Sequence, residues 1–201
     1  MDKIKSYYEM KLKKHGTNHK GVDWKSLESQ ELRFVKLFEL IDKREPAFDV
    51  LDYGCGYGAL LDYLNIHYKN FIYSGYDISE QMIFNAKLIF RSKAYTWYTN
   101  LDNKKKFSYV VASGLFNVKL SYTEGEWKDY IIETLDKINF ISNKGFSFNI
   151  LSTFSDKEKM TDKLFYADPS FLFNHCKKKY SKHVSLLHDY PLYEFTIIVK
   201  K

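Results

Sequence analysis

The chain has 201 residues, 45% of them hydrophobic, and a formal net charge of +6. This length and composition suit one compact domain with a buried core. The sequence has no uncharged apolar run of about 18 residues and no hydrophobic leader, so we expect a cytoplasmic protein without a membrane span. The two cysteines, Cys55 and Cys176, are too few for a disulfide framework or a zinc-finger pattern, so we expect no metal site.

The first predicted element is a helix near the N-terminus. It runs from Trp24 to about Lys43, with Asp23 as its N-cap. Its apolar face consists of Trp24, Leu27, Phe34, Phe38 and Ile41. We expect residues 1–46 to form a helical cap on a core of residues 47–201, within a single domain.

Five runs rich in β-branched and aromatic residues follow, and helical patterns separate most of them. The runs are residues 47–53, 71–77, 94–99, 107–113 and 145–151. Continuous apolar strands between crossover helices are typical of a parallel sheet that is covered on both faces. The segment "VSLLHDYPLYEFTIIVKK" predicts two more strands joined by a turn, so the sequence indicates an open α/β sheet that ends in a C-terminal hairpin.

Three helices are predicted between and after these strands. One follows Ser79, the next begins at the capping-box pair Thr123 and Glu126, and the last covers residues 169–180. The side chains expected to face inward are Met82, Ile83, Ala86 and Ile89 in the first of these helices, and Trp127, Ile131, Leu135 and Ile138 in the second.

The stretch "VLDYGCGYGALLDYL", residues 50–64, joins the first strand to a helix through three glycines at alternate positions. Glycine lets a ligand approach the backbone, and the N-terminus of the helix that follows attracts electronegative atoms. Asp77 ends the next strand about 20 residues later, where a carboxylate accepts both hydroxyls of an adenosine ribose. These residues predict an adenosine-containing ligand and leave a dinucleotide among the candidates.

The segments "VLDYGCGYGALLDYL" and "YSGYDISEQMI" together resemble motifs I and II of the class I S-adenosylmethionine-dependent methyltransferases. In that family an acidic residue precedes the glycine pattern, and Asp52 has that position here. A carboxylate suits the ammonium and sulfonium groups of this donor and repels the pyrophosphate of a dinucleotide. The resemblance covers Phe48 to the C-terminus and favours a methyltransferase over a dinucleotide oxidoreductase.

The resemblance also implies the fold and the donor site. It implies a Rossmann-like seven-stranded sheet, made of five parallel-type strands and the hairpin, with helices on both faces and an N-terminal helical lid. The residues expected to contact S-adenosylmethionine, or its product S-adenosylhomocysteine, are Asp52, Gly54, Cys55, Gly56, Asp77, Ile78, Met82, Asn100, Leu101, Ser113 and Gly114.

Some of these assignments have alternatives. Ile78 and Met82 either pack on the adenine or belong to the ordinary core. Asn100 departs from the aspartate that is more usual in the family at the adenine amino group. Cys55, between two glycines, is expected to be a small turn residue and not a nucleophile.

The acceptor is expected to bind between the N-terminal segment and the C-terminal hairpin. The candidate catalytic residues are His188, as a general base, with Asn117 and Tyr190, and the candidate substrate-binding residues are Tyr7, Trp24, Gln30 and Arg33. Arg33 either clamps an anionic group or pairs with a nearby glutamate on the surface. A histidine such as His188 more often satisfies a loop carbonyl.

The excess of basic over acidic residues favours a small anionic acceptor. The phrases "GVDW" and "HDYPLYEF" are similar to those of small bacterial methyltransferases, some from capsular polysaccharide pathways that build O-methyl phosphoramidate groups. The sequence "SGLFNV" replaces the Asn/Asp-Pro-Pro-aromatic motif of enzymes that methylate exocyclic nitrogens of bases. An RNA methyltransferase, favoured by the lysine clusters, and a non-catalytic scaffold are the alternatives. We expect a monomer or a homodimer.

Overall fold

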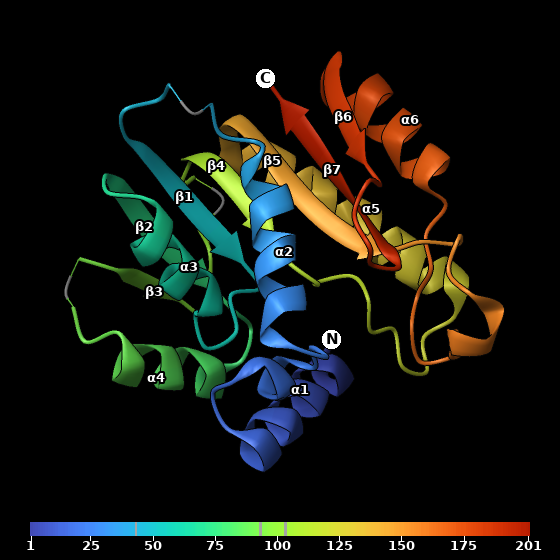
Figure 1. Ribbon diagram of the computed structural model, residues 1–201, viewed down its shortest axis with the longest axis horizontal. Helices are drawn as coiled ribbons and strands as arrows, with labels where there is room; N and C mark the ends of the chain where they lie inside the picture. The colour runs from blue at the N-terminus through green and yellow to red at the C-terminus, as the bar shows by residue number, and fades with distance from the viewer. Residues whose placement is uncertain (43, 93, 103) are drawn as a thin grey trace.

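The computed structural model describes residues 1–42, 44–92, 94–102 and 104–201. Helices and strands alternate along most of the chain (Figure 1). The helices are α1 (Asp2–His15), α2 (Leu27–Phe38), α3 (Ala59–His67), α4 (Glu80–Ile89), α5 (Glu124–Ile141) and α6 (Pro169–Lys179), with short 3-10 helices η1 (His19–Val22) and η2 (Lys157–Lys159). The strands are β1 (Phe48–Tyr53), β2 (Phe71–Tyr76), β3 (Thr96–Tyr98), β4 (Phe107–Ala112), β5 (Ser142–Leu151), β6 (His183–Leu187) and β7 (Glu194–Lys200).

The seven strands form one sheet in the order β3-β2-β1-β4-β5-β7-β6. Strands β1 to β5 run parallel, whereas β7 pairs antiparallel with both β5 and β6. This arrangement confirms the predicted Rossmann-like α/β sheet with a C-terminal hairpin. The strand order reverses next to β1, which has β2 on one side and β4 on the other, so the ends of these three strands border the crevice where ligands bind in such sheets.

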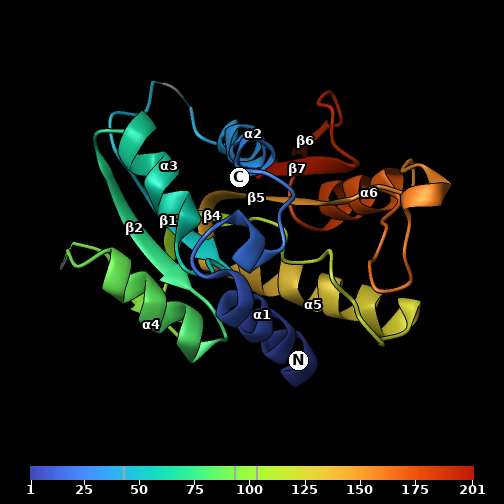
Figure 2. The same ribbon diagram turned by 60° about the horizontal axis from the view of Figure 1, so that its bottom comes forward.

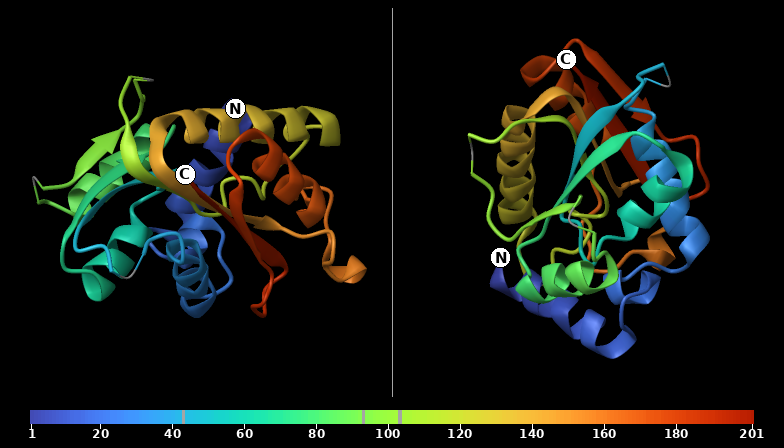
Figure 3. Two further views of the ribbon diagram at one scale, coloured as in Figure 1. Left: turned by 90° about the horizontal axis from the view of Figure 1, so that it is seen from above. Right: turned by 90° about the vertical axis from the view of Figure 1, so that its left-hand side faces the viewer.

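Helices cover both faces of the sheet. In Figure 3 α5 and α6 lie on one side, and α2 and α3 lie on the other. The predicted stripe of α5, which is Trp127, Ile131, Leu135 and Ile138, is fully buried against the sheet. The central strands are buried on both faces, which explains their continuous apolar sequences.

The helix expected from Trp24 begins later than predicted. Asp23 has φ 65°, a left-handed conformation, and ends η1, so it cannot cap an α-helix that starts at Trp24. The N-cap is Ser26, which forms a reciprocal capping box with Ser29. The helix ends at Phe38, and the predicted end at Lys43 lies outside the described residues.

Two apolar side chains predicted to face inward are exposed. Leu27 is the first residue of α2 and points to solvent, because the helix starts only there. Ile89 is the last residue of α4, a helix that packs near the edge strand β3, so the core does not extend to it. Met82, Ile83 and Ala86 of the same helix are buried as predicted.

The N-terminal helix α1 lies at the carboxyl ends of β1 and β2, beside α4 (Figure 2). Leu12 packs with Tyr57 and Met82, and the Ser79 hydroxyl donates a 2.8 Å hydrogen bond to Glu9. These contacts hold α1 over the glycine turn, as the predicted N-terminal lid requires. No helix in the described part of the chain is both long and apolar enough to cross a bilayer.

Candidate active site

The glycine turn after β1 is the base of the site. The amides of Gly54 and Cys55 both donate to the carbonyl of Tyr76, at 2.7 and 2.9 Å, which ties the turn to the end of β2. Gly54 and Gly56 have φ values of 85° and 55°, which L side chains rarely adopt. A Cβ on Gly54 would lie 2.9 Å from a terminal methyl of Leu115, so a side chain there would have to displace Leu115 as well as adopt this strained φ.

A cavity of about 240 Å³ opens above this turn, between the strand ends and α1. Its lining includes most of the residues predicted to hold the donor: Asp52, Gly54, Cys55, Gly56, Asp77, Ile78, Met82, Ser113 and Gly114. Trp24 and Gln30, which were predicted to bind substrate, line it as well. Residues that are far apart in the sequence therefore meet at this end of the sheet.

Two carboxylates line the cavity in different ways. Asp52 is buried and accepts one hydrogen bond, 2.9 Å from the Tyr73 hydroxyl; burial raises its pKa to about 7. Asp77 accepts the backbone amides of Gly56 and Ser79 at 2.9 and 2.8 Å. Burial raises the pKa of Asp77, and these two amide bonds oppose that rise. Within the described residues, neither carboxylate has a salt bridge.

Other polar and apolar groups complete the lining of the cavity. The buried hydroxyl of Ser113 has no hydrogen-bond partner among the described residues. Gly114 has φ 67°, and a Cβ there would collide with the Trp24 ring. The cavity thus combines two carboxylates that form no salt bridge among the described residues, a hydroxyl without a partner there, and apolar walls. This combination fits a ligand that carries cationic and hydroxyl groups on an apolar body.

Cys55 lines the cavity but is not an activated nucleophile. It is buried, and burial raises the pKa of its thiol well above the ordinary value. The neighbouring carboxylates Asp52 and Asp77 raise it further. The prediction that Cys55 is a turn residue agrees with this environment.

Some cavity residues were not among the predicted site residues. They include Lys5 and Tyr8 of α1, Phe34 of α2, and Tyr130 and Lys137 of α5. The four-residue spacing of Ile4, Tyr8 and Leu12 on α1 marks an apolar helix face and was the available signal. Nothing in the sequence near α5 indicates that this helix reaches the ligand cavity.

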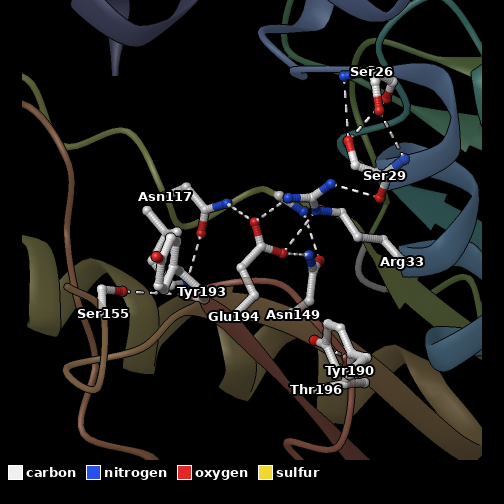
Figure 4. A network of polar contacts seen from close by, with 12 residues as sticks. Ser26, Ser29, Arg33, Asn117, Asn149, Ser155, Tyr190, Tyr193, Glu194 and Thr196 are labelled. Atoms are coloured by element: carbon white, nitrogen blue, oxygen red, sulfur yellow. Dashed lines mark hydrogen bonds and ion pairs between the residues drawn. The ribbon is translucent and has the colours of Figure 1, made fainter. Parts of the chain in front are cut away.

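Arg33 does not face the cavity. Its Nε and Nη2 atoms donate to the two carboxylate oxygens of Glu194 at 2.8 and 2.7 Å, and both side chains are buried (Figure 4). Its Nη1 donates to the carbonyl of Ser29 at 2.6 Å. Arg33 is committed to this buried pair and does not line the cavity, so the structure does not support a ligand clamp, and the surface pairing considered as the alternative is wrong as well.

The predicted catalytic residues lie outside the cavity lining in the described structure. His188 is exposed. The centroid of its ring lies 6.0 Å from that of the Phe154 ring and 6.1 Å from that of the Phe195 ring. Tyr190 is buried and pairs with the Thr196 hydroxyl at 2.9 Å. Asn117 accepts the Leu151 amide at 3.1 Å, which uses its side chain to join the β4 loop to β5.

Three other predicted residues also lie away from the lining in the part of the chain that is described. The Tyr7 hydroxyl donates to Asp23 and so joins α1 to the end of η1. Asn100 is exposed after β3, whereas Leu101 packs against the core under α5. The structure therefore brings together the glycine turn and both carboxylates but not the predicted adenine contacts after β3.

Comparison with known proteins identifies the family of the chain. A family model described as a methyltransferase domain matches residues 27–189. The putative methyltransferase Rv1506c of Mycobacterium tuberculosis is 47% identical over 165 residues, which are 81% of this chain and 98% of that protein.

Solved structures share the fold at low identity. Magnesium protoporphyrin IX methyltransferase (ChlM) from Synechocystis PCC 6803 with bound SAH is 14% identical, with a TM-score of 0.60 over 87% of this chain and 82% of that chain. DhpI in complex with SAH is 11% identical, with a TM-score of 0.65 over 98% of this chain and 94% of that chain. From its sequence match and its sheet topology, the chain belongs to the class I S-adenosylmethionine-dependent methyltransferases.

Proposed function

We propose that the protein transfers a methyl group from S-adenosylmethionine to a small anionic acceptor bound in the cavity above the glycine turn. The observation that carries the donor site is the buried Asp52, which faces the cavity with no salt bridge among the described residues. A cationic ligand group there offsets the cost of burying the carboxylate.

The residues that line the cavity fit this donor. Asp52 would bind the ammonium group, Asp77 the ribose hydroxyls, and the Ser113 hydroxyl a polar atom of the amino-acid end. Ile78 and Met82 would pack on the adenine. The bound donor supplies an electrophilic methyl group on a sulfonium.

During methyl transfer the protein aligns the donor with the acceptor and excludes water. Methyl transfer is an in-line displacement in which positive charge disperses, so a closed and apolar site favours it. Helix α1 covers the cavity, and Ile4 and Tyr8 contribute to its wall. A roofed cavity of about 240 Å³ suits a small acceptor better than an RNA strand.

The cavity offers few general bases beyond Asp52 and Asp77, which are assigned to the donor, and this supports an acceptor that is already ionised. No histidine lines the cavity within the described residues. Burial raises the pKa of Tyr130 to about 12 and that of Tyr8 further, so both phenols stay protonated near neutrality. Lys5 and Lys137 are the lysines of the described chain that line the cavity, and they would bind an acceptor oxyanion.

The test is methyl transfer from labelled S-adenosylmethionine to a panel of acceptors. The panel contains nucleotide-linked or glycan-precursor metabolites with phosphate or phosphoramidate groups, neutral alcohols and amines of similar size, and tRNA. We expect transfer to the anionic small molecules, with a turnover rate that is flat across neutrality when S-adenosylmethionine is saturating. Transfer only to neutral acceptors, or to tRNA, would exclude the proposed acceptor class.

Two lysine variants sharpen this test. Lys5→Ala and Lys137→Ala should each raise the KM of the anionic acceptor about tenfold, since each removes a charge-assisted hydrogen bond. Lys178→Ala, an exposed lysine on α6, is the matched control and should leave KM unchanged. A KM that stays at the wild-type value in both cavity variants would show that the acceptor binds elsewhere.

A further inference from the structure

A buried polar network lies behind the cavity wall and joins α2, β5 and β7. Glu194 at the start of β7 accepts two hydrogen bonds from Arg33, and its Oε2 also accepts from the Asn149 side-chain amide (Figure 4). Asn117 donates to Oε1 of Glu194 at 3.4 Å. All four groups aimed at this carboxylate are donors, and the carboxylate is buried.

The network reaches the cavity at two points. The Asn149 side-chain oxygen accepts the backbone amide of Gly114 at 2.8 Å. The Arg33 guanidinium stacks on the Trp24 ring, with its carbon 4.0 Å from a ring centroid. Trp24 lies against Gly114, and both residues line the cavity.

The chemistry of Glu194 determines which way Asn149 points. An ionised carboxylate has acceptors only, so the Asn149 amide must direct its NH₂ toward Glu194. Its carbonyl oxygen then points the other way, toward the Gly114 amide. In Glu194→Gln, an NH₂ at the Oε2 position would face the Asn149 NH₂ and favour the opposite orientation of Asn149, whereas an NH₂ at the Oε1 position would face the donors of Arg33 and Asn117.

We propose that Glu194 is a positioning residue for methyl transfer. Through Asn149 it fixes the Gly114 backbone, and through Arg33 it holds Trp24 against Gly114. The inference rests on the proposed function, because Gly114 and Trp24 wall the cavity assigned to the donor. Stability alone would not require this ion pair, because apolar side chains often replace a buried ion pair without loss of stability. A purely stabilising role therefore explains these contacts less well.

The variants that test this are Glu194→Gln, Asn149→Ala and the double variant Arg33→Met/Glu194→Met. The control is Ser147→Ala on the same strand, which removes a buried 2.9 Å hydrogen bond to the Leu37 carbonyl and does not touch the cavity. We measure S-adenosylhomocysteine binding by calorimetry and amide hydrogen exchange at Gly114 in the ligand-free protein.

We expect each test variant to bind S-adenosylhomocysteine about tenfold more weakly and to exchange the Gly114 amide about tenfold faster. Ser147→Ala should change neither quantity. Asn149→Ala should weaken binding less in a Glu194→Gln background than in the wild type, because the two residues share the contact to Gly114. The apolar double variant leaves no unpaired buried charge, although the Asn117 and Asn149 amides lose their acceptor, so it should lose less stability than Glu194→Ala and still bind weakly.

Wild-type affinity in a stable Arg33→Met/Glu194→Met protein would overturn the inference, as would unchanged exchange at Gly114 in the same variant. Failure of the wild-type protein to bind S-adenosylhomocysteine would instead overturn the proposed function. In that case the exchange measurement still decides whether Glu194 positions Gly114.

Discussion

Asp52 and Glu194 are both buried carboxylates near the same edge of the sheet, yet their surroundings are opposite. Glu194 is paired with Arg33 and receives side-chain amides from Asn117 and Asn149. Asp52 receives only the Tyr73 hydroxyl within the described residues and faces the cavity. The protein itself satisfies the charge of Glu194, whereas Asp52 has no cationic partner among the described residues.

We propose that this difference separates a structural ion pair from a carboxylate that binds a ligand. A carboxylate that is buried without a cation costs folding free energy, and that cost is recovered when a cationic ligand binds. The raised pKa of Asp52 reflects this free-energy cost, because burial disfavours the ionised carboxylate. Each of the following variants changes one side of the comparison.

The largest effect is expected at the satisfied carboxylate. Glu194→Ala leaves the Arg33 guanidinium buried without its partner, and it should lower the free energy of unfolding by about 3–5 kcal/mol. Chemical denaturation measures this change. A loss below about 1 kcal/mol would mean that water reaches Arg33 and that the pair is less buried than the structure indicates.

Asp77→Ala should weaken S-adenosylhomocysteine binding about a hundredfold, since two hydrogen bonds to a carboxylate are each worth about 1.5–3 kcal/mol. The variant also leaves the amides of Gly56 and Ser79 without their acceptor, so a modest loss of stability accompanies it. Calorimetry on the folded variant measures the affinity. Glu80→Ala, an exposed neighbour, is the control, and an equal loss there would contradict a specific role for Asp77.

The free energy of unfolding should depend on pH through the ionisation of Asp52. The pKa of this carboxyl is about 7 in the folded protein, against an ordinary value of 3.8. Between these values the folded protein retains a proton that the unfolded chain releases, so stability falls as pH rises across this window, by up to about 1.4 kcal/mol per pH unit. Above about pH 7 this loss is complete.

Asp52→Asn removes this contribution. The difference in unfolding free energy between wild type and variant should therefore change across the window, with the variant relatively more stable at pH 8 than at pH 5. Donor affinity of the wild type should rise as pH passes through 7, because only the ionised carboxylate binds an ammonium group strongly. A constant difference between the two proteins would show that Asp52 is ionised throughout.

The smallest effect is expected at the hairpin. His188 is exposed and its ring lies near Phe154 and Phe195, so His188→Ala should change turnover by less than about twofold and leave the pH profile unaltered. Steady-state kinetics with an identified acceptor provide the measurement. A loss of about a hundredfold would restore His188 as a general base and require the hairpin to close over the cavity.

Local sequence patterns predicted most of the fold. The alternation of apolar runs and helical stripes gave the five parallel strands and the hairpin, and capping residues such as Ser79 and Thr123 marked helix starts correctly. The beginning of α2 was missed because Asp23, a common N-cap residue, adopts a left-handed conformation held by Tyr7 and Lys11 of another helix.

The sequence by itself determined the glycine turn and the carboxylates Asp52 and Asp77, because these groups lie at the ends of adjacent strands and depend on residues close in the chain. Only the tertiary structure decided the role of Arg33. Its helix allows the side chain to face either the cavity or the sheet, and its partner Glu194 lies 161 residues later. A buried guanidinium pairs with the carboxylate that folding brings to it, and spacing along a helix does not show which one that is.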